Sequence, residues 1–318
     1  MTRPASIALV SFPTLSPHAD KRLESTLDAM GQYVGQAADQ GADLVAFPEI
    51  CNHLGDHDSW QFEPLDGPTV QAMAAKAREH GIYVVCPLAT LEQGSRYNSS
   101  VLLGRQGEIV GIYHKNFPTH TELDVGVVPG TETPVFETDF GRIGLTICFD
   151  LNYWEVGSSL AAQSPELVIW SSMWSGARML TRWSIEFGFQ MGAVWSGSVT
   201  FVDVAGREIA SRQRRLSDRV GLSPVLTQTL DLDHRLLHHD GNVGRLAPLI
   251  AAHGPNAIDA EWLDEECLLV MVSRLANTST DELIAEFGLE PMGRYLARVR
   301  RDRQAALDGT YVPVQRHH

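Results

Sequence analysis

Apolar and polar positions along the first half of the chain follow two alternating periods. Short apolar runs such as SIALVSF and DLVAFPE are typical of buried strands, and the stretches between them place apolar residues at helical spacing. The predicted strands are 6–12, 43–49, 82–89, 101–104 and 108–115, and the predicted helices are 18–40 and 68–80, the second of which ends at Gly81. Three strands in close succession favour a mixed sheet over a purely parallel one.

The same alternation continues after a polar loop at 117–130. Strands are predicted at 134–138, 141–150, 166–172 and 223–232, and helices at 153–163 and 178–193. Segment 196–211 has the pattern of a hairpin that turns at Ala205 and Gly206. The pattern places Cys148 at the carboxyl end of a buried strand, directly before a turn.

Beyond about residue 233 the pattern changes to helices with charged faces, including TDELIAEFGL and the basic run RYLARVRRDRQ. We therefore expect an α/β domain over 1–232 and a helical C-terminal extension over 233–318, with 223–232 as the last clear strand. The basic run is interpreted as a solvated helix face, and an interaction patch is the alternative.

Composition narrows the classes of function. A chain of 318 residues with 44% apolar content can bury a full core. The formal net charge of -14 disfavours nucleic acid and anionic membrane surfaces as partners. The four cysteines form no CxxC pair, which fits a reducing cytoplasm. The first apolar run is too short for a signal peptide, and no apolar stretch is long enough to span a membrane.

Three chemically complementary residues end predicted strands. Glu49 follows LVAFP, Lys115 follows GIYH, and Cys148 lies in ICFD. A free cysteine is usually a small buried hydrophobe, so Cys148 alone would mean little. Charged residues at the carboxyl ends of strands can project into one cleft, however, and this makes Cys148 a candidate nucleophile. The remaining cysteines, Cys51, Cys86 and Cys267, lack that setting and are interpreted as structural.

These three side chains form a complete set for attack on an amide-type carbon. A free thiol is only a few per cent thiolate at pH 7, so it needs a base or a nearby cation. Glu49 can take the thiol proton and later return it to the leaving amine. Lys115 can stabilise the thiolate and the oxyanion, and the backbone N–H of Phe149 is the natural second donor to the oxyanion. This chemistry predicts no cofactor and no metal.

The segments FPE (47–49), YHK (113–115) and GLTICFDLNYWE (144–155) resemble the three signature segments of the nitrilase superfamily of carbon–nitrogen hydrolases. The resemblance covers about residues 5–232. It implies a four-layer αββα sandwich, catalytic Glu49, Lys115 and Cys148, and a thioester acyl-enzyme that water hydrolyses. It also implies a homodimer or larger assembly through the helices that flank the nucleophile strand.

The resemblance extends to further residues. Glu122, in the loop after the lysine, fits the family's second glutamate, which would hold Lys115 charged and orient substrate and water. Asp150 and Glu155 occupy places where family members carry acids, and we interpret them as structural supports. The pocket is expected to be walled by Trp154, Met173 and Trp174, although these side chains fit a core or an interface equally well.

The nucleophile segment CFD looks more like the amidase and carbamoylase branches than the true nitrilases, so a small amide or N-carbamoyl compound is favoured as substrate over a nitrile. One departure from the family's pattern is a loop between Glu186 and Trp195 that is shorter than in relatives. This departure leaves open a nitrilase-like fold without turnover that serves as a binding or regulatory subunit.

A metal-dependent amidohydrolase is a further alternative. Its motivation is the twelve histidines, including His53, His57, His234, His238 and His239, but none forms an HxH or HExxH arrangement.

Overall fold

The computed structural model describes residues 4–11, 22–53 and 60–313, with the backbone alone for Arg22, Leu216 and Ser217. Position 12 of the first predicted strand and positions 18–21 of the first predicted helix lie outside the described residues.

The first sheet has six strands in the order β12-β1-β2-β3-β4-β5. They are β1 (Pro4–Val10), β2 (Leu44–Ala46), β3 (Tyr83–Glu92), β4 (Ser95–Leu103), β5 (Ile109–His114) and β12 (Val225–Asp231). Strands β1, β2 and β3 run parallel, and the other neighbours are antiparallel. The prediction of a mixed sheet is confirmed.

The second sheet repeats this plan in the order β11-β10-β9-β8-β7-β6. Its strands are β6 (Val135–Glu137), β7 (Arg142–Ile147), β8 (Leu167–Ser172), β9 (Gln190–Trp195), β10 (Ser198–Val202) and β11 (Glu208–Gln213). Here β7, β8 and β9 are parallel, and the outer pairs are antiparallel. The hairpin predicted at Ala205 and Gly206 is confirmed, because Gly206 has a φ of 77° and its N–H donates to the carbonyl of Asp203.

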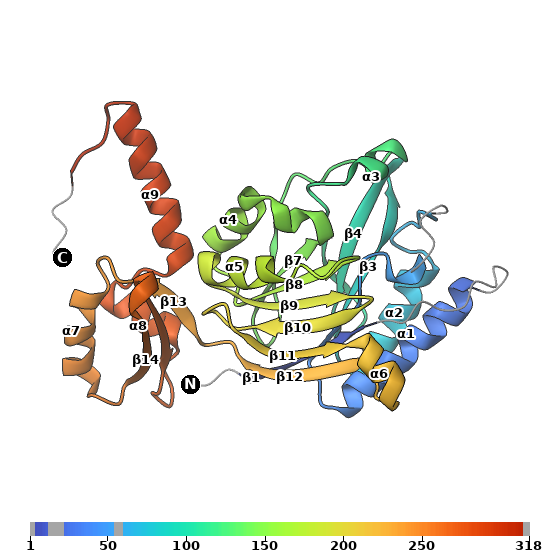
Figure 1. Ribbon diagram of the computed structural model, residues 1–318, viewed down its shortest axis with the longest axis horizontal. Coiled ribbons are helices and arrows are strands. Elements are labelled where there is room, and N and C mark those ends of the chain that lie inside the picture. The colour runs from blue at the N-terminus through green and yellow to red at the C-terminus, as the bar shows by residue number, and fades with distance from the viewer. Residues whose placement is uncertain (1–3, 12–21, 54–59, 314–318) are drawn as a thin grey trace.

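The two sheets pack face to face, and helices cover both outer faces (Figure 1). Apolar side chains of both sheets, such as Leu9 and Ile169, fill the space between them. Helices α1 (Arg22–Asp39) and α2 (Pro68–His80) cover the first sheet, and α4 (Trp154–Ala162) and α5 (Arg178–Phe187) cover the second. The four-layer αββα sandwich is thereby confirmed. Helix α6 (Arg214–Val220) joins β11 to β12.

The helix predicted at 178–193 is too long. Helix α5 ends at Phe187 because Gly188 adopts a left-handed φ of 77°, where its N–H donates to the carbonyl of Ser184. The following run QMGAVW forms β9, which pairs in parallel with β8 and is buried there. In the sequence, apolar residues continue at helical spacing beyond Gly188, so the pattern predicted a longer helix. In the structure, this glycine ends the helix.

The C-terminal extension contains the predicted helices and also a sheet that the sequence analysis missed. Its helices are α7 (Val243–His253), α8 (Thr280–Phe287) and α9 (Met292–Leu307), and its sheet has the order β13-β15-β14, formed by β13 (Arg235–His238), β14 (Ile258–Leu263) and β15 (Leu268–Ser273). The expectation that the last strand lies at 223–232 is wrong. The run LLVMVS is buried on both faces and pairs on both edges, so it lacks the polar alternation that marks a half-exposed strand.

The C-terminal unit has its own core, in which Leu237, Met271 and Leu283 meet. The division into 1–232 and 233–318 stays a prediction, and it falls in the connection between β12 and β13. None of the helices in the described ranges has the length and apolar character needed to cross a bilayer.

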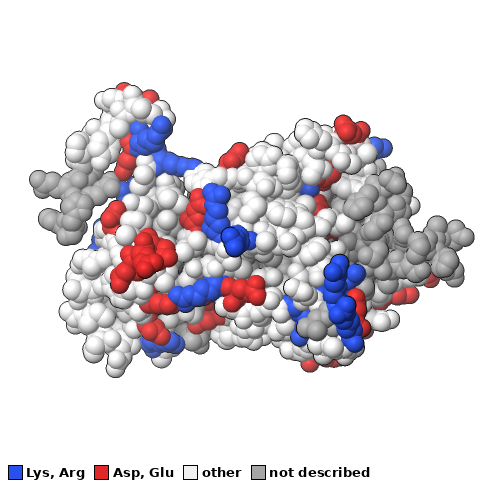
Figure 2. All heavy atoms as spheres, viewed as in Figure 1, with Lys and Arg blue, Asp and Glu red and all other residues white. Residues whose placement is uncertain are grey.

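Helix α9 leaves the C-terminal unit and packs against α4 (Figure 1). Gly293 makes this approach possible, because a Cβ there would lie 2.3 Å from the carbonyl oxygen of Ala161. Basic side chains are visible along α9 in Figure 2, and acidic ones gather below it over the C-terminal unit. Of the basic run, Arg300 lies 3.3 Å from the centroid of the Trp154 ring and Arg298 pairs with Glu290. The helix thus covers part of the face through which the resemblance implies an assembly, and that assembly stays a prediction.

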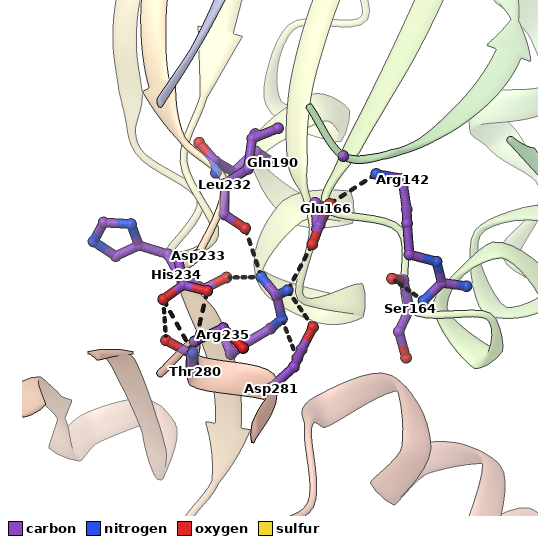
Figure 3. Close-up of polar contacts among 12 residues, drawn as sticks. Arg142, Ser164, Glu166, Gln190, Leu232, Asp233, His234, Arg235, Thr280 and Asp281 are labelled. Carbon is purple, nitrogen blue, oxygen red and sulfur yellow. Dashed lines mark hydrogen bonds and ion pairs between the residues drawn. The ribbon is translucent and has the colours of Figure 1, made fainter. Parts of the chain in front are cut away.

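A buried arginine joins the C-terminal unit to the sandwich (Figure 3). Arg235, the first residue of β13, pairs with Glu166 at 2.8 Å and with Asp281 of α8 at 2.6 Å. Glu166 immediately precedes β8, so this junction lies at the amino ends of the parallel strands. The carboxyl ends of the same strands lie at the opposite edge.

Candidate active site

The three strand-end residues singled out from the sequence converge at the carboxyl edge of the two sheets. Glu49 follows β2, Lys115 follows β5, and Cys148 follows β7. All three are buried, with exposed fractions of 3%, 1% and 8%. The hydroxyl of Ser171, at the end of β8, donates to the carbonyl of Phe47 at 2.9 Å and ties the two sheets together beside the site.

Lys115 lies between two carboxylates. Its Nζ is 2.8 Å from Oε1 of Glu49 and 2.7 Å from Oε2 of Glu122. Burial lowers the pKa of this ammonium, but the charges of Glu49 and Glu122 outweigh it and hold the pKa above its ordinary value. An ammonium has three N–H donors, so one remains for a further acceptor.

Glu122 reaches Lys115 because it belongs to a short capped helix, α3 (His120–Asp124). Thr119 is the N-cap, and both its backbone N–H and its hydroxyl donate to Oε2 of Glu122, at 2.7 and 2.8 Å. Burial raises the pKa of Glu122. The Lys115 charge, together with hydrogen bonds from Lys115, Asn98 and Thr119, outweighs burial and lowers it. Glu122 is therefore a fixed anion that helps to keep Lys115 charged.

Asn98 is a member of this cluster that the sequence analysis missed. Its Nδ2 donates to Oε1 of Glu49 at 2.8 Å and to Oε1 of Glu122 at 2.7 Å. The residue lies in β4 and is completely buried. Little in the sequence pointed to it, because Asn98 belongs to a polar run, NSS, that precedes the predicted strand 101–104. The structure begins β4 at Ser95 and buries this run.

Cys148 occupies a strained position at the start of a short 3-10 helix, η3 (Cys148–Asn152). Its φ of 45° is left-handed, a region that costs a non-glycine residue about 1–3 kcal/mol. The indole N–H of Trp170 holds the turn by donating to the Cys148 carbonyl at 3.0 Å. The backbone at this turn therefore fixes where the sulfur lies.

The Cys148 thiol is protonated at rest. Burial raises its pKa to about 12, and the charge of Glu49 acts in the same direction. Lys115 and hydrogen bonds from the Met173 backbone N–H and the Ser172 hydroxyl oppose this rise without cancelling it. Attack by this sulfur thus requires removal of its proton by a neighbouring base.

The structure agrees with the structural role expected of Asp150. This buried carboxylate accepts from the hydroxyl of Tyr113 at 2.7 Å, from the N–H of Phe117 at 2.9 Å and from the N–H of Ile147 at 3.0 Å. It thus connects the lysine strand to the nucleophile turn. Burial raises its pKa to about 6, against the Lys115 charge and these hydrogen bonds. Glu155 is exposed in the first turn of α4.

The residues proposed to surround the substrate have different positions. Phe149 directly follows the nucleophile, and the backbone N–H of Met173 reaches the sulfur. Trp174 packs edge-to-face on Trp170, with 5.6 Å between ring centroids. Trp154 lies away from them in the outer helix layer, against Phe187 and under Arg300. The structure therefore does not bring Trp154 to the nucleophile with the others.

The other cysteines and the histidines near β13 lie outside this cluster, and His53 is buried in the short 3-10 helix Cys51–His53 that follows Glu49. Cys51 and Cys86 are buried in the core under α1 and α2, and Cys267 is exposed in the C-terminal unit. His234, His238 and His239 lie at or beside β13, and His57 falls outside the described residues. Within the described part of the chain, no three His, Cys, Asp or Glu residues gather as metal ligands would.

A buried glutamate, a buried lysine and a buried cysteine lie together at one edge of an αββα sandwich. The family described as carbon-nitrogen hydrolase matches residues 6–193, more than half of the chain. The chain therefore belongs to the carbon–nitrogen hydrolase family, and its assignment to the nitrilase superfamily is confirmed.

Relatives and solved structures agree with this assignment. Hydrolase MT0498 of Mycobacterium tuberculosis (strain CDC 1551 / Oshkosh) is 31% identical over 173 residues, 51% of this chain and 60% of the relative. Aliphatic nitrilase of Rhodococcus rhodochrous is 29% identical over 143 residues, 39% of each chain. The chain thus spans less than two thirds of these relatives.

Among solved structures, Saccharomyces cerevisiae Nit3, a member of branch 10 of the nitrilase superfamily, superposes with a TM-score of 0.62 at 19% identity, covering 72% of this chain and 90% of that one. An amidase from Nesterenkonia sp. gives 0.59 at 20% identity, covering 71% and 90%. These likenesses show the shared fold.

Proposed function

We propose that this protein hydrolyses a non-peptide carbon–nitrogen bond of a small amide or N-carbamoyl compound through a thioester on Cys148. One observation carries the proposal. Oε2 of Glu49 is a buried carboxylate oxygen without a hydrogen-bond partner among the described residues, whereas Oε1 of the same group accepts from both Lys115 and Asn98. A buried acceptor is rarely left unfilled without a reason, and here the reason is a proton to be received.

In the first half of the reaction, Glu49 takes the thiol proton as the Cys148 sulfur attacks the substrate carbonyl carbon. The carbonyl oxygen becomes an oxyanion, which the third N–H of Lys115 and the N–H of Phe149 stabilise. When the oxyanion collapses, the carbon–nitrogen bond breaks and Glu49 returns its proton to the leaving nitrogen. The products of this half are ammonia or an amine and a thioester on Cys148.

In the second half, water occupies the place of the leaving nitrogen. Glu49 takes a proton from this water as its oxygen attacks the thioester carbon. Collapse of the second tetrahedral intermediate breaks the carbon–sulfur bond, and the proton on Glu49 passes to the departing sulfur. The acid product leaves, and the enzyme returns to a thiol and a carboxylate.

Glu122 does not share the role of base in this scheme. Both of its oxygens already accept hydrogen bonds, Oε1 from Asn98 and Oε2 from Lys115 and both donors of Thr119, whereas Glu49 keeps one oxygen without a partner among the described residues. It acts by holding Lys115 in place and charged. The different hydrogen bonds of the two glutamates thus support Glu49 as the base and Glu122 as the residue that holds Lys115.

An amide is favoured over a nitrile as substrate on the segment CFD, with nitrile hydrolysis as the alternative that the nitrilase relatives support. Met173 and Trp174 would give the site a partly apolar wall on the nucleophile's side. A binding or regulatory subunit without turnover is a third possibility, against which the intact cluster of Glu49, Lys115 and Cys148 argues.

Ammonia release tests the proposal. The panel contains small aliphatic and aromatic amides, N-carbamoyl amino acids and nitriles, and it compares the wild type with Cys148→Ala. Release by the wild type that disappears in the variant is the expected result, and the preferred compound identifies the branch. Release that persists in Cys148→Ala would overturn the cysteine mechanism. Turnover of nitriles alone would replace the amide proposal by the nitrile alternative.

A further inference from the structure

We propose that Asn98 is a positioning residue that decides which oxygen of Glu49 acts as the base. This inference rests on the proposed function, because it assigns a role within that reaction. The residue touches neither the sulfur nor the substrate in the scheme above, and it acts through the two glutamates.

The hydrogen bonds of the cluster form a closed ring. Lys115 donates to Glu49 and Glu122 on one side, and Asn98 donates to the same two carboxylates on the other. Both ring donors meet Glu49 at Oε1. With Oε1 held by two donors, the carboxylate cannot rotate without breaking both bonds, and Oε2 stays the free oxygen.

The orientation of the Asn98 amide follows from its surroundings. A reversed amide would turn its oxygen toward two carboxylates and lose both hydrogen bonds. Nδ2 has two hydrogens, and each has a carboxylate acceptor at 2.7 or 2.8 Å. Asn98 therefore supplies two donors between two anions without adding a second cation, which would compete with Lys115 for the oxyanion.

The backbone of Asn98 supports the same arrangement. Its carbonyl accepts from the N–H of Lys115 at 2.9 Å, just beyond the pairing of β4 with β5. One strand position thus holds the backbone of the lysine and, through its side chain, both glutamates. A side-chain substitution leaves the backbone bond in place, so the two contributions can be separated.

The test compares the variants Asn98→Ala, Asn98→Ser and Asn98→Asp in the full chain. Asn98→Ala removes donors that favour charged carboxylates, so the acid limb of the kcat/KM profile is expected to move to higher pH by roughly one unit. We expect kcat to fall roughly five- to tenfold or more, because Oε1 of Glu49 loses one of its two donors. Asn98→Asp adds a third carboxylate and should shift the limb further, and Asn98→Ser keeps one donor and should shift it less.

Asn242→Ala is the matched control. Asn242 is also completely buried and also bridges two segments, donating to the carbonyls of His238 and Glu290 in the C-terminal unit. Its loss should lower stability and leave the pH profile unchanged. If the Asn98→Ala profile superimposes on that of the wild type, the inference is overturned. Where Asn98→Ala does not fold, Asn98→Ser carries the same comparison.

A substrate-independent measurement separates failure of this inference from failure of the proposed function. The rate of iodoacetamide alkylation at Cys148, followed by peptide mass spectrometry, is compared between the wild type and Glu49→Gln. Equal rates, together with no ammonia release from any compound, would remove the proposed function. A wild type that turns over substrate while Asn98→Ala keeps its pH profile would remove the role of Asn98 alone.

Discussion

Two buried cations in this molecule are each held between two carboxylates. They differ in whether all the hydrogen-bonding groups around them have partners. At the carboxyl edge of the sheets, Lys115 lies between Glu49 and Glu122. At the amino edge, Arg235 lies between Glu166 and Asp281 (Figure 3). Both cations are buried, although the side chain of Asp281 is 52% exposed. In both clusters the carboxylates raise the pKa of the cation against the effect of burial.

The arginine cluster is saturated. Nε and Nη2 of Arg235 donate to the two oxygens of Asp281, Nη2 also meets Glu166, and Nη1 donates to the carbonyls of Leu232 and His234. The second oxygen of Glu166 accepts from the backbone N–H of Arg142. A planar guanidinium with five donors suits this structural joint, in which Arg235 connects the C-terminal unit to the sandwich.

Among the described residues, the lysine cluster is unsaturated in three places. The ammonium keeps one donor, and two acceptor oxygens, Oε2 of Glu49 and Oδ1 of Asn98, have no hydrogen-bond partner. Unfilled hydrogen-bonding capacity next to Cys148 therefore distinguishes the proposed active site from the structural joint at Arg235, whereas burial of the cation and ion pairing do not.

The largest effect is expected for Glu49→Gln. The amide keeps the shape of the side chain but cannot take the thiol proton, so kcat/KM should fall by up to about 10⁴-fold. Lys115 keeps Glu122, so we expect little change in the unfolding transition. Ammonia release on the best compound of the panel and urea denaturation measure the two quantities. A variant that unfolds readily but keeps its rate would reverse the comparison.

Arg235→Leu should have the opposite signature. It leaves the buried carboxylate of Glu166 without its cation, which typically costs about 3–5 kcal/mol of the free energy of unfolding. The rate of the folded enzyme should not change, because the joint lies at the other edge of the sheets. Urea denaturation and kcat/KM of the same preparation test this. A large loss of rate without loss of stability would show that the joint serves the site.

Asp150 offers a pH-dependent test between these extremes. Its pKa in the folded protein is raised to about 6. The protonated form of Asp150 therefore stabilises the fold, and this stabilisation is fully present below the unfolded pKa of about 3.9. It is lost as pH rises through 6. The wild type should therefore lose up to about 3 kcal/mol relative to the non-titrating variant Asp150→Asn between pH 4 and pH 7. Urea denaturation of both proteins across that pH range measures this difference in unfolding free energy. A difference that does not change with pH would contradict the raised pKa of Asp150.

The smallest effect is expected for Arg274→Ala. Arg274 and Asp259 form an ion pair in the C-terminal unit whose side chains are 48% and 62% exposed. Removing it should cost less than about 1 kcal/mol, and even less at high salt. Denaturation at two salt concentrations measures this, with Arg235→Leu as the buried counterpart. Equal costs for the two arginines would mean that burial is not what gives the joint its strength.

Much of the sandwich was predictable because its strands are short apolar runs and its helices have clear stops. Helix α2 ends before Gly81 as predicted. The strand predicted at 141–150 ends at Ile147, so Cys148 directly follows it and begins the turn. The errors have a common cause. The strands β9 and β15 are buried on both faces, and a fully buried strand has no polar alternation to separate it from a helix.

Residues of the site were predictable where they come at the end of a predicted strand. Glu49, Lys115 and Cys148 each end a strand in sequence, and Glu122 fits a family pattern in a loop. Asn98 was missed because the polar run NSS was left outside the predicted strand 101–104, whereas β4 begins at Ser95. Arg235 was missed because its partners lie 69 and 46 positions away along the chain.

The sequence by itself indicated the family and the two strand-rich halves, and it singled out Glu49, Lys115 and Cys148 as the candidate base, cation and nucleophile, since these depend on local patterns and motifs. Only the tertiary structure decided which carboxylate oxygen is free, that Asn98 closes the ring, and that α9 lies on α4. Such facts depend on atoms from distant segments meeting within hydrogen-bond distance, and no local pattern encodes that meeting.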